Sequence, residues 1–342
     1  MPNDSQRIRS AVARASCRAD LAGGTLDIWP LGLLHRESRT VNVALNLGVE
    51  VEMVPRESGY LVQQGGSRIE AGTTAELANI AETALLGLTL EELEVPPVEV
   101  TIESGSPRGG GLGGSSALAV ATIAVGEVVV GQGESSAEKR AILARDLEAR
   151  LMSLPTGRQD HYSALFGGVL EIRHEPGGDR IRQLAIDLNV LGEAFVVVYT
   201  GQSHFSAGHN WQVVRNRLES DKETIRCFDG IRDVALGIVD ALEQGRLAEV
   251  GELMSQEWSW RRRLAEGIST PKIEQLLKAA VNEGAWGGKA CGAGGGGCLV
   301  MLCPPAARAD VEQILTRLGA QVLPARPADR PLWVRFSNGA AS

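Results

Sequence analysis

The sequence predicts an α+β fold that divides into two domains. Apolar and polar residues alternate across residues 41–54, which indicates a strand, whereas apolar residues recur at helical spacing over 77–88. Such segments are mixed along the chain rather than strictly alternating, as is typical of α+β proteins. Most expected strands lie in the first half, and the pattern changes across residues 188–195. We therefore expect an N-terminal domain over 1–190 and a C-terminal domain over 191–342.

The remaining elements are expected in the following order. The first half should contain further strands at 59–66 and 96–104, a helix at 134–152 behind two capping serines, and a hairpin at 164–186 that turns at Pro176-Gly177-Gly178. The second half should contain strands at 194–200 and 331–336 and helices within 210–265, 270–282 and 307–320. A glycine-rich run ending at Gly297 leads into another apolar strand.

Composition excludes several classes of protein. Hydrophobic residues make up 44% of the 342 residues, and the net charge of −8 argues against a nucleic-acid binder, although a local site can still bind a polyanionic small molecule. No apolar run reaches about 18 residues, and the N-terminus lacks the apolar segment of a signal peptide. The five cysteines form no C-x-x-C pair, so we expect reduced, buried thiols. We therefore expect a cytoplasmic protein without nucleic-acid or membrane partners. A monomer or a homodimer is expected, and the sequence does not decide between them.

The most distinctive segment is PRGGGLGGSSA, residues 107–117, between an expected strand and a long apolar stretch suited to a buried helix. Glycines allow positive φ angles and close approach of a ligand, and the free N–H groups of a helix start bind anions. This favours a phosphate site, with Ser115 and Ser116 placed to cap the helix or to ligate a metal. A glycine turn with a serine cap remains the alternative. No lysine follows Gly114, which excludes a P-loop, and no suitably placed acidic residue supports a Rossmann site.

Two further segments accompany this one: RASCRADLAGGTLDIWP at 14–30 and GGKACGAGGGGCLVML at 287–302. Together the three resemble the ordered signatures of the GHMP kinases. The resemblance covers nearly the whole chain and is strongest to the sugar-kinase branch that contains heptose 7-phosphate kinase, fucokinase and glucuronokinase. That branch also carries a segment similar to GRQDHYSALFGG, at 157–168. Gly114 stands where many relatives have serine, and Cys17 where galactokinases have glycine, but neither change removes a group that the chemistry requires.

The resemblance implies a two-domain fold with a ferredoxin-like C-terminal domain and an active site in the cleft between the domains. It implies ATP and Mg²⁺, with the cation on Ser115 and Glu148, and with Asp160 accepting or orienting the proton of a sugar hydroxyl. Arg18 would keep Asp160 ionised and stabilise charge on the moving phosphoryl group. The ATP phosphates would lie along Pro107, Gly109, Gly110, Gly111, Leu112, Gly113, Gly114, Ser115 and Ser116.

Judged by residue type alone, these positions also fit purely structural roles. Glu148 is flanked by charges and could belong to a solvated helix face, Asp160 could cap a helix, and Arg18 could pair on the surface. His204 and His209 lie in a polar loop that could face a sugar or simply cap the next helix, and they lack a third partner for a metal site. The expected sugar-side residues are Gly23, Gly24, Asp27, His161, Lys289, Gly292 and Gly294. For three of these predictions a second role is also expected: His161 could support a neighbouring site residue, Lys289 could contact a phosphate, and the turn at 292–297 could pack against the phosphate loop.

The sequence thus predicts an ATP-dependent kinase that transfers the γ-phosphate to a hydroxyl, in this branch typically the anomeric one, of a sugar or sugar phosphate such as heptose 7-phosphate. The identity of the sugar does not follow from the sequence. A non-sugar alcohol as acceptor is one alternative. A non-catalytic sensor on the same fold is another, but the joint presence of Asp160, Arg18, Glu148 and Ser115 argues against it.

Overall fold

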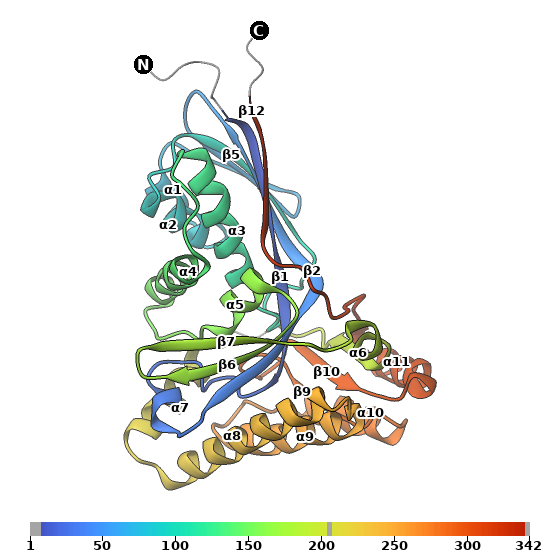
Figure 1. The fold of residues 1–342 in the computed structure, drawn as a ribbon. Helices are drawn as coiled ribbons and strands as arrows, with labels where there is room; N and C mark the ends of the chain where they lie inside the picture. The colour runs from blue at the N-terminus through green and yellow to red at the C-terminus, as the bar shows by residue number, and fades with distance from the viewer. Residues whose placement is uncertain (1–7, 204–206, 339–342) are drawn as a thin grey trace.

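The computed structural model of the chain describes residues 8–203 and 207–338. Within these residues the chain forms two β-sheets, with helices packed against both (Figure 1). His204 lies outside the described residues, as does the side chain of His209, so the predicted role of that loop stays a prediction. None of the described helices is both long and apolar enough to cross a membrane.

The first sheet is built around two long neighbouring strands, β1 and β2. Its strand order is β12-β1-β2-β5-β3-β4, and β6 pairs with both β2 and β7. The bounds are β1 Ile8–Ala22, β2 Arg39–Pro55, β3 Tyr60–Gln64, β4 Ser67–Ala71, β5 Val98–Ser104, β6 Val169–Glu175, β7 Gly178–Leu184 and β12 Trp333–Asn338. β1 was not among the expected strands, because buried small and charged residues hide its alternation.

Five helices accompany this sheet: α1 Thr74–Ala78, α2 Ala84–Glu92, α3 Gly114–Val129, α4 Ala137–Met152 and α5 Gln159–Phe166. Helix α3 is almost wholly buried and packs against β1 and β2, which its many small apolar residues permit. The single helix expected at 77–88 is wrong, because the chain breaks there into α1 and α2. Glycine 113 adopts φ 74° and ends the preceding loop, so α3 begins at Gly114.

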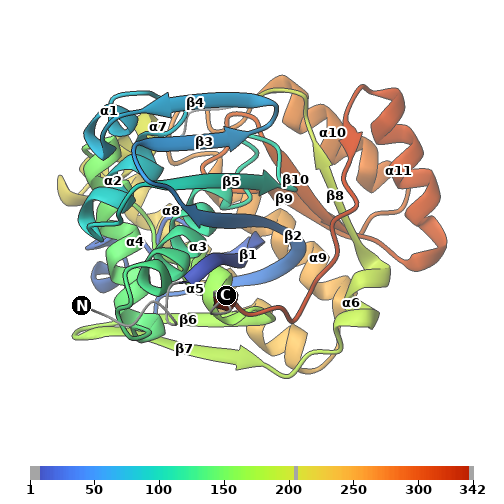
Figure 2. The same cartoon turned by 90° about the horizontal axis from the view of Figure 1, so that it is seen from above.

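The second sheet has the strand order β11-β8-β10-β9, with antiparallel pairing throughout. Strands β8, β9 and β10 are labelled in Figure 2. Numbered within this sheet, the order is 4-1-3-2, so the expected ferredoxin-like arrangement is confirmed. Its strands are β8 Phe195–Tyr199, β9 Gly287–Ala290, β10 Cys298–Leu302 and β11 Gln321–Val322. The helices of this part are α6 Leu188–Ala194, α7 Ala207–Leu218, α8 Lys222–Glu243, α9 Leu247–Arg261, α10 Pro271–Asn282 and α11 Arg308–Arg317. A short 3₁₀ turn lies at Pro305–Ala307, and another lies at Leu31–Leu34, between β1 and β2 of the first sheet.

Strand β12 follows the last strand of the second sheet in sequence but belongs to the first sheet, where it pairs antiparallel with β1. The register places Phe336 opposite Ala11 and Trp333 opposite Arg14. The last strand of the chain that the structure describes therefore contributes to the sheet formed by the first. A single division at residue 190 stays a prediction, and β12 shows that the chain crosses back after it.

Candidate active site

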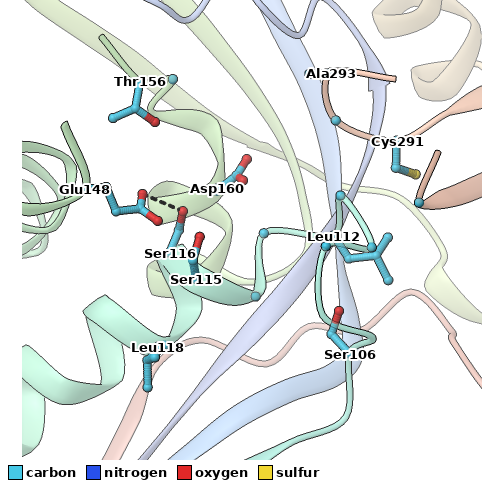
Figure 3. A pocket seen from close by; sticks show the side chains of 18 of the residues that line it. Ser106, Leu112, Ser115, Ser116, Leu118, Glu148, Thr156, Asp160, Cys291 and Ala293 are labelled. Atoms are coloured by element: carbon cyan, nitrogen blue, oxygen red, sulfur yellow. Dashed lines mark hydrogen bonds between the residues drawn. The ribbon is translucent and has the colours of Figure 1, made fainter. Parts of the chain in front are cut away.

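A pocket of about 500 Å³ brings together the segments that the sequence singled out (Figure 3). Its lining comes from the glycine-rich loop and the start of α3, from α4 and α5, from the turn after β1, and from the glycine run between β9 and β10. Of the expected site residues, those in the lining are Arg18, Gly24, Asp27, Pro107, Gly109, Gly110, Gly111, Leu112, Gly113, Gly114, Ser115, Ser116, Glu148, Asp160, Gly292 and Gly294.

The loop between β5 and α3 has a backbone shape that strongly favours glycine. Gly109, Gly111 and Gly113 adopt φ angles of 65°, 72° and 74°. A Cβ at Gly111 would lie 2.6 Å from the carbonyl oxygen of Cys291, so the glycine run after β9 packs directly against this loop. The backbone N–H of Cys298 also donates to Gly110 at 2.8 Å, which makes the two glycine runs one rigid wall of the pocket.

The start of α3 is open toward the pocket. Its N-cap residue is Gly113, and within the described residues no side chain caps the helix. The serine-cap alternative is therefore wrong: Ser115 and Ser116 lie inside the first turn, and the first N–H groups of the helix are left for an anion.

Glu148 of α4 lies beside these serines and is 5% exposed. The hydroxyl of Ser116 donates to Glu148 Oε2 at 2.8 Å (Figure 3), and Nε2 of His161 lies 2.8 Å from the same oxygen. Burial alone would raise the pKa of Glu148, but His161 and the two serines outweigh it and lower the pKa. The result is an ionised carboxylate next to hydroxyl oxygens, a set of hard oxygen donors that fits Mg²⁺.

His161 takes one of its two expected places, behind a site residue and not on the sugar side. Its side chain is fully buried, lies outside the pocket lining, and pairs with Glu148 from behind. Burial alone would lower its pKa, but the charge of Glu148 raises it. A direct contact with a sugar is therefore wrong for this residue, because α5 turns it toward α4 and away from the cavity.

Asp160 and Arg18 form an ion pair at the floor of the pocket. Asp160 lies in the first turn of α5, and Arg18 projects from β1. Nε and Nη2 of Arg18 lie 2.7 and 2.6 Å from Oδ1 of Asp160, and Nη1 donates to the carbonyl of Gly111. Burial raises the pKa of Asp160, the charge of Arg18 lowers it, and the charge of Asp27 raises it again, with a net rise above its usual range.

Asp27 uses its two oxygens differently. Oδ2 accepts hydrogen bonds from the backbone N–H groups of Arg158 at 2.8 Å and Gln159 at 3.0 Å, and so caps α5, whose N-cap residue Arg158 makes no capping hydrogen bond of its own. Oδ1 is buried in the pocket wall without a hydrogen-bond partner among the described residues. The helix cap that the sequence left open for Asp160 thus belongs to Asp27, and one oxygen of Asp27 is left for a donor from a ligand.

Two other residues that were expected to contact a sugar lie outside the pocket lining. Lys289 is fully buried outside the lining, where it pairs with Asp20 at 2.7 Å and Glu257 at 3.0 Å, so it cannot reach a sugar or phosphate. Gly23 also lies outside the lining, and a Cβ there would lie 2.0 Å from the carbonyl oxygen of Arg39. This glycine therefore serves backbone packing, not approach of a ligand.

Comparisons with known proteins agree with this architecture. The family model described as GHMP kinases N terminal domain matches residues 76–168, and the one described as GHMP kinases C terminal matches residues 238–321. A mevalonate kinase of Pyrococcus horikoshii is 33% identical over 245 residues, which are 68% of each chain. The D-glycero-alpha-D-manno-heptose 7-phosphate kinase of Campylobacter jejuni is 25% identical over 321 residues, 88% of this chain and 91% of that one.

Among solved structures, a D-glycero-D-manno-heptose 1-phosphate kinase from Bacteroides thetaiotaomicron superposes with a TM-score of 0.74 at 18% identity, over 96% of this chain and 100% of that one. The fold is that of a small-molecule kinase. The chain belongs to the GHMP kinase family, and it is an ATP-dependent phosphotransferase.

Proposed function

We propose that this kinase transfers the γ-phosphate of ATP to a hydroxyl of a sugar or sugar phosphate, most simply the anomeric hydroxyl. The observation that carries the proposal is the free, buried Oδ1 of Asp27 in the same pocket as Asp160. A buried carboxylate oxygen without a partner is costly unless a ligand donates to it, and sugar hydroxyls are such donors.

The similar proteins are named for two classes of acceptor, sugars and mevalonate. The two carboxylates Asp27 and Asp160 favour the sugar, because a sugar offers several adjacent hydroxyl donors for them to accept from. The heptose 7-phosphate kinase relative covers more of the chain than the mevalonate kinase does, which supports the same choice.

Each of the side chains in the pocket has a proposed role in the transfer of the phosphoryl group. The acceptor oxygen attacks the γ-phosphorus, the bond from that phosphorus to the bridging oxygen breaks with its electron pair going to ADP, and the hydroxyl proton passes to Oδ2 of Asp160. Arg18 anchors Oδ1 and stabilises charge on the phosphoryl group. The N–H groups of the loop and of α3 hold the phosphates.

Ser115, Ser116 and Glu148 would hold Mg²⁺ at the edge of the phosphate loop. When bound, the cation neutralises phosphate charge and orients the phosphate oxygens. The pair of His161 with Glu148 keeps that carboxylate ionised and turned toward the serines.

An ADP-release assay across separate acceptors tests the proposal. The panel is L-fucose, D-galactose, D-glucuronic acid, D-glycero-D-manno-heptose 7-phosphate and mevalonate, each with saturating Mg²⁺ and ATP. We expect turnover with at least one sugar, and ³¹P NMR of its product then reports which hydroxyl is phosphorylated. Turnover with mevalonate alone would overturn the sugar assignment, and release of ADP with none of them would favour the sensor alternative.

A further inference from the structure

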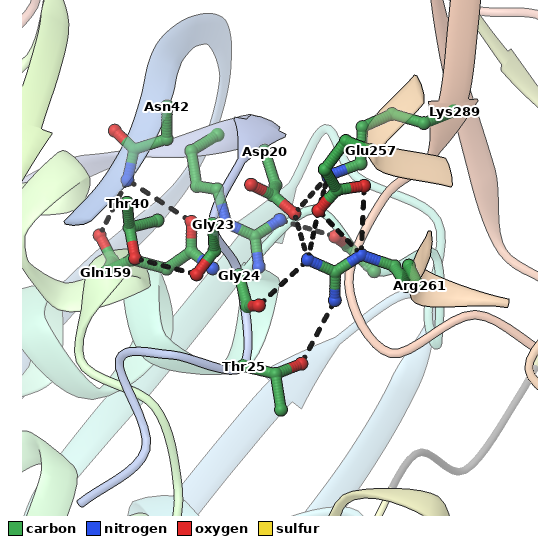
Figure 4. Close-up of polar contacts among 12 residues, drawn as sticks. Asp20, Gly23, Gly24, Thr25, Thr40, Asn42, Gln159, Glu257, Arg261 and Lys289 are labelled. Atoms are coloured by element: carbon green, nitrogen blue, oxygen red, sulfur yellow. Dashed lines mark hydrogen bonds and ion pairs between the residues drawn. The ribbon is translucent and has the colours of Figure 1, made fainter. Parts of the chain in front are cut away.

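Four charged side chains lie buried together beneath the sugar side of the pocket (Figure 4): Asp20 of β1, Glu257 and Arg261 of α9, and Lys289 of β9. None is more than 1% exposed. We refer to these four residues as the buried charge cluster. It connects the first sheet to a strand and a helix of the second, and its two positive and two negative charges balance.

The contacts inside the cluster pair each positive side chain with a negative one. Lys289 Nζ lies 2.7 Å from Asp20 Oδ2 and 3.0 Å from Glu257 Oε1. Arg261 Nε donates to Glu257 at 2.9 Å. Buried ion pairs generally add little stability beyond what apolar packing would give, so stability alone is a poor reason for this arrangement.

Arg261 also reaches out of the cluster to the pocket wall. Its Nη2 donates to the carbonyl oxygen of Gly24 at 2.8 Å, and its Nη1 donates to Oγ1 of Thr25 at 3.0 Å (Figure 4). Both Gly24 and Thr25 line the pocket. A single planar guanidinium therefore holds two consecutive residues of the turn that follows β1.

This turn needs such support. Thr25 adopts φ 73°, a left-handed conformation that a β-branched residue rarely takes unless its surroundings impose it. Gly24 rests on the cluster so closely that a Cβ there would lie 2.6 Å from Asp20 Oδ2. The N–H of Leu26 donates to the carbonyl oxygen of Gly23 at 3.2 Å, and the N–H of Ile28 donates to that of Thr25 at 3.1 Å. These two hydrogen bonds connect the turn to the segment that contains Asp27.

We propose that Arg261 is a positioning residue, which fixes the Gly24–Thr25 turn and thereby sets Asp27 against the acceptor. Glu257 holds the guanidinium through Nε and Nη2, while Nη1 and Nη2 donate to the turn. Through this contact, α9 of the second part of the chain shapes the acceptor side of a pocket whose phosphate loop belongs to the first. The part played by Asp27 rests on the proposed function, but the hold on the turn does not.

Hydrogen exchange on the full-length chain tests the hold directly. Arg261→Lys keeps the charge of the cluster but loses the fork that reaches Gly24 and Thr25. We expect the amides of Leu26 and Ile28 to exchange about tenfold faster in this variant, with little change elsewhere. Exchange within about twofold of the wild type would overturn the proposal, as would an equal acceleration throughout α9 and β9, which would indicate a general loss of stability.

A matched control and a second variant complete this experiment. Arg262→Lys changes the neighbouring arginine, which is half exposed and pairs with Glu274, and it should leave both amides unchanged. Thr25→Val removes one acceptor of Arg261 without touching the cluster, so it can be measured even if Arg261→Lys does not fold. It should accelerate the same two amides by about threefold, and unchanged exchange would count against the proposal.

Steady-state kinetics with L-fucose, or with whichever panel sugar is turned over, adds the functional measurement. Arg261→Lys should raise KM for the sugar about fivefold or more and leave KM for ATP within about twofold. An equal rise in both would contradict a role confined to the acceptor side. Should no sugar be turned over, the proposed function fails while the exchange measurement still decides whether Arg261 holds the turn.

Discussion

Arg18 contacts Asp160 through one carboxylate oxygen only, because its Nε and Nη2 lie 2.7 and 2.6 Å from the same Oδ1. Oδ2 lies on the other side, 3.0 Å from the position that a Cβ would take at Gly113 of the phosphate loop. One oxygen is therefore anchored, and the other faces the loop at which the ATP phosphates would bind. The two oxygens of Asp160 therefore have different contacts, and substitutions can test their roles separately.

Replacing Asp160 by asparagine should remove proton acceptance while keeping the size of the side chain. We expect kcat to fall about 100-fold or more, as is usual for loss of a general base, and the affinity for ATP to change little. Turnover is followed by ADP release and binding by titration calorimetry. Wild-type turnover in this variant would show that Asp160 is not catalytic.

Replacing Arg18 by methionine should move the pH profile of kcat/KM. Asp160 must be ionised to accept a proton, so activity is lost as the pH falls through its pKa. The charge of Arg18 lowers that pKa, which burial has already raised. Without Arg18 the acidic limb should shift to higher pH by about one to three units, whereas Arg18→Lys should shift it less. A limb that stays in place would separate Asp160 from the observed ionisation.

Replacing Glu148 by glutamine should raise the Mg²⁺ concentration needed for half-maximal activity by about tenfold. Asp146→Asn provides the control, since Asp146 lies two residues earlier on the same helix but is exposed and pairs with Arg145. The measurement is a Mg²⁺ titration at fixed ATP. Coincident titrations for the wild type and Glu148→Gln would remove this residue from the metal site.

Replacing Gly111 by alanine should displace the phosphate loop, because the new Cβ would lie 2.6 Å from the carbonyl oxygen of Cys291. We expect ATP affinity to fall about tenfold or more in addition to a stability loss of about 1 kcal/mol from the positive φ. Gly131→Ala isolates the second effect, since Gly131 has φ 71° and open space around it. Equal ATP affinity in the two variants would show that the close packing of the loop is unimportant.

Replacing Glu171 by glutamine should change the response to acid. Burial alone would raise the pKa of Glu171, but Arg173, Arg182 and Arg39 lower it below the ordinary value of 4.5. A carboxyl whose pKa is lower in the folded chain stabilises the protein above its unfolded value and loses that contribution as the pH falls through the folded value.

We therefore expect the wild-type free energy of unfolding to decline below about pH 4.5 more steeply than that of Glu171→Gln, measured by urea denaturation. Glu175→Gln on the same strand, where the carboxylate pairs with the exposed Arg180, should follow the wild type. Parallel curves for all three proteins would contradict the assignment.

The sequence was most informative where chemistry requires particular backbone shapes. The glycine run at 107–117 predicted a loop between a strand and a helix, and Gly111 and Gly113 indeed adopt positive φ angles. The three signature segments together predicted the family and the fold, since their order along the chain is itself a constraint on topology. The first signature and the further segment at 157–168 also identified Arg18 and Asp160, which lie 142 positions apart in sequence yet form an ion pair.

Predictions failed where the outcome depends on a partner that no local pattern reveals. A lysine inside a glycine-rich segment suggested a phosphate contact, but Asp20 and Glu257 draw Lys289 into the interior. Arg261 went unnoticed for the same reason. Its spacing from Glu257 by one helical turn was the available signal for a pair, whereas its contact with Gly24 depends on how the second sheet packs against the first.

The return of β12 to β1 sets the order in which the protein can be completed during synthesis. The free edge of β1 emerges from the ribosome early, but its partner is not available until residues 333–338 have been made. For most of translation the nascent chain therefore presents an unpaired strand edge, of the kind that recruits other chains. Chaperone dependence in expression should follow from this edge, and truncation before residue 333 should make the dependence permanent.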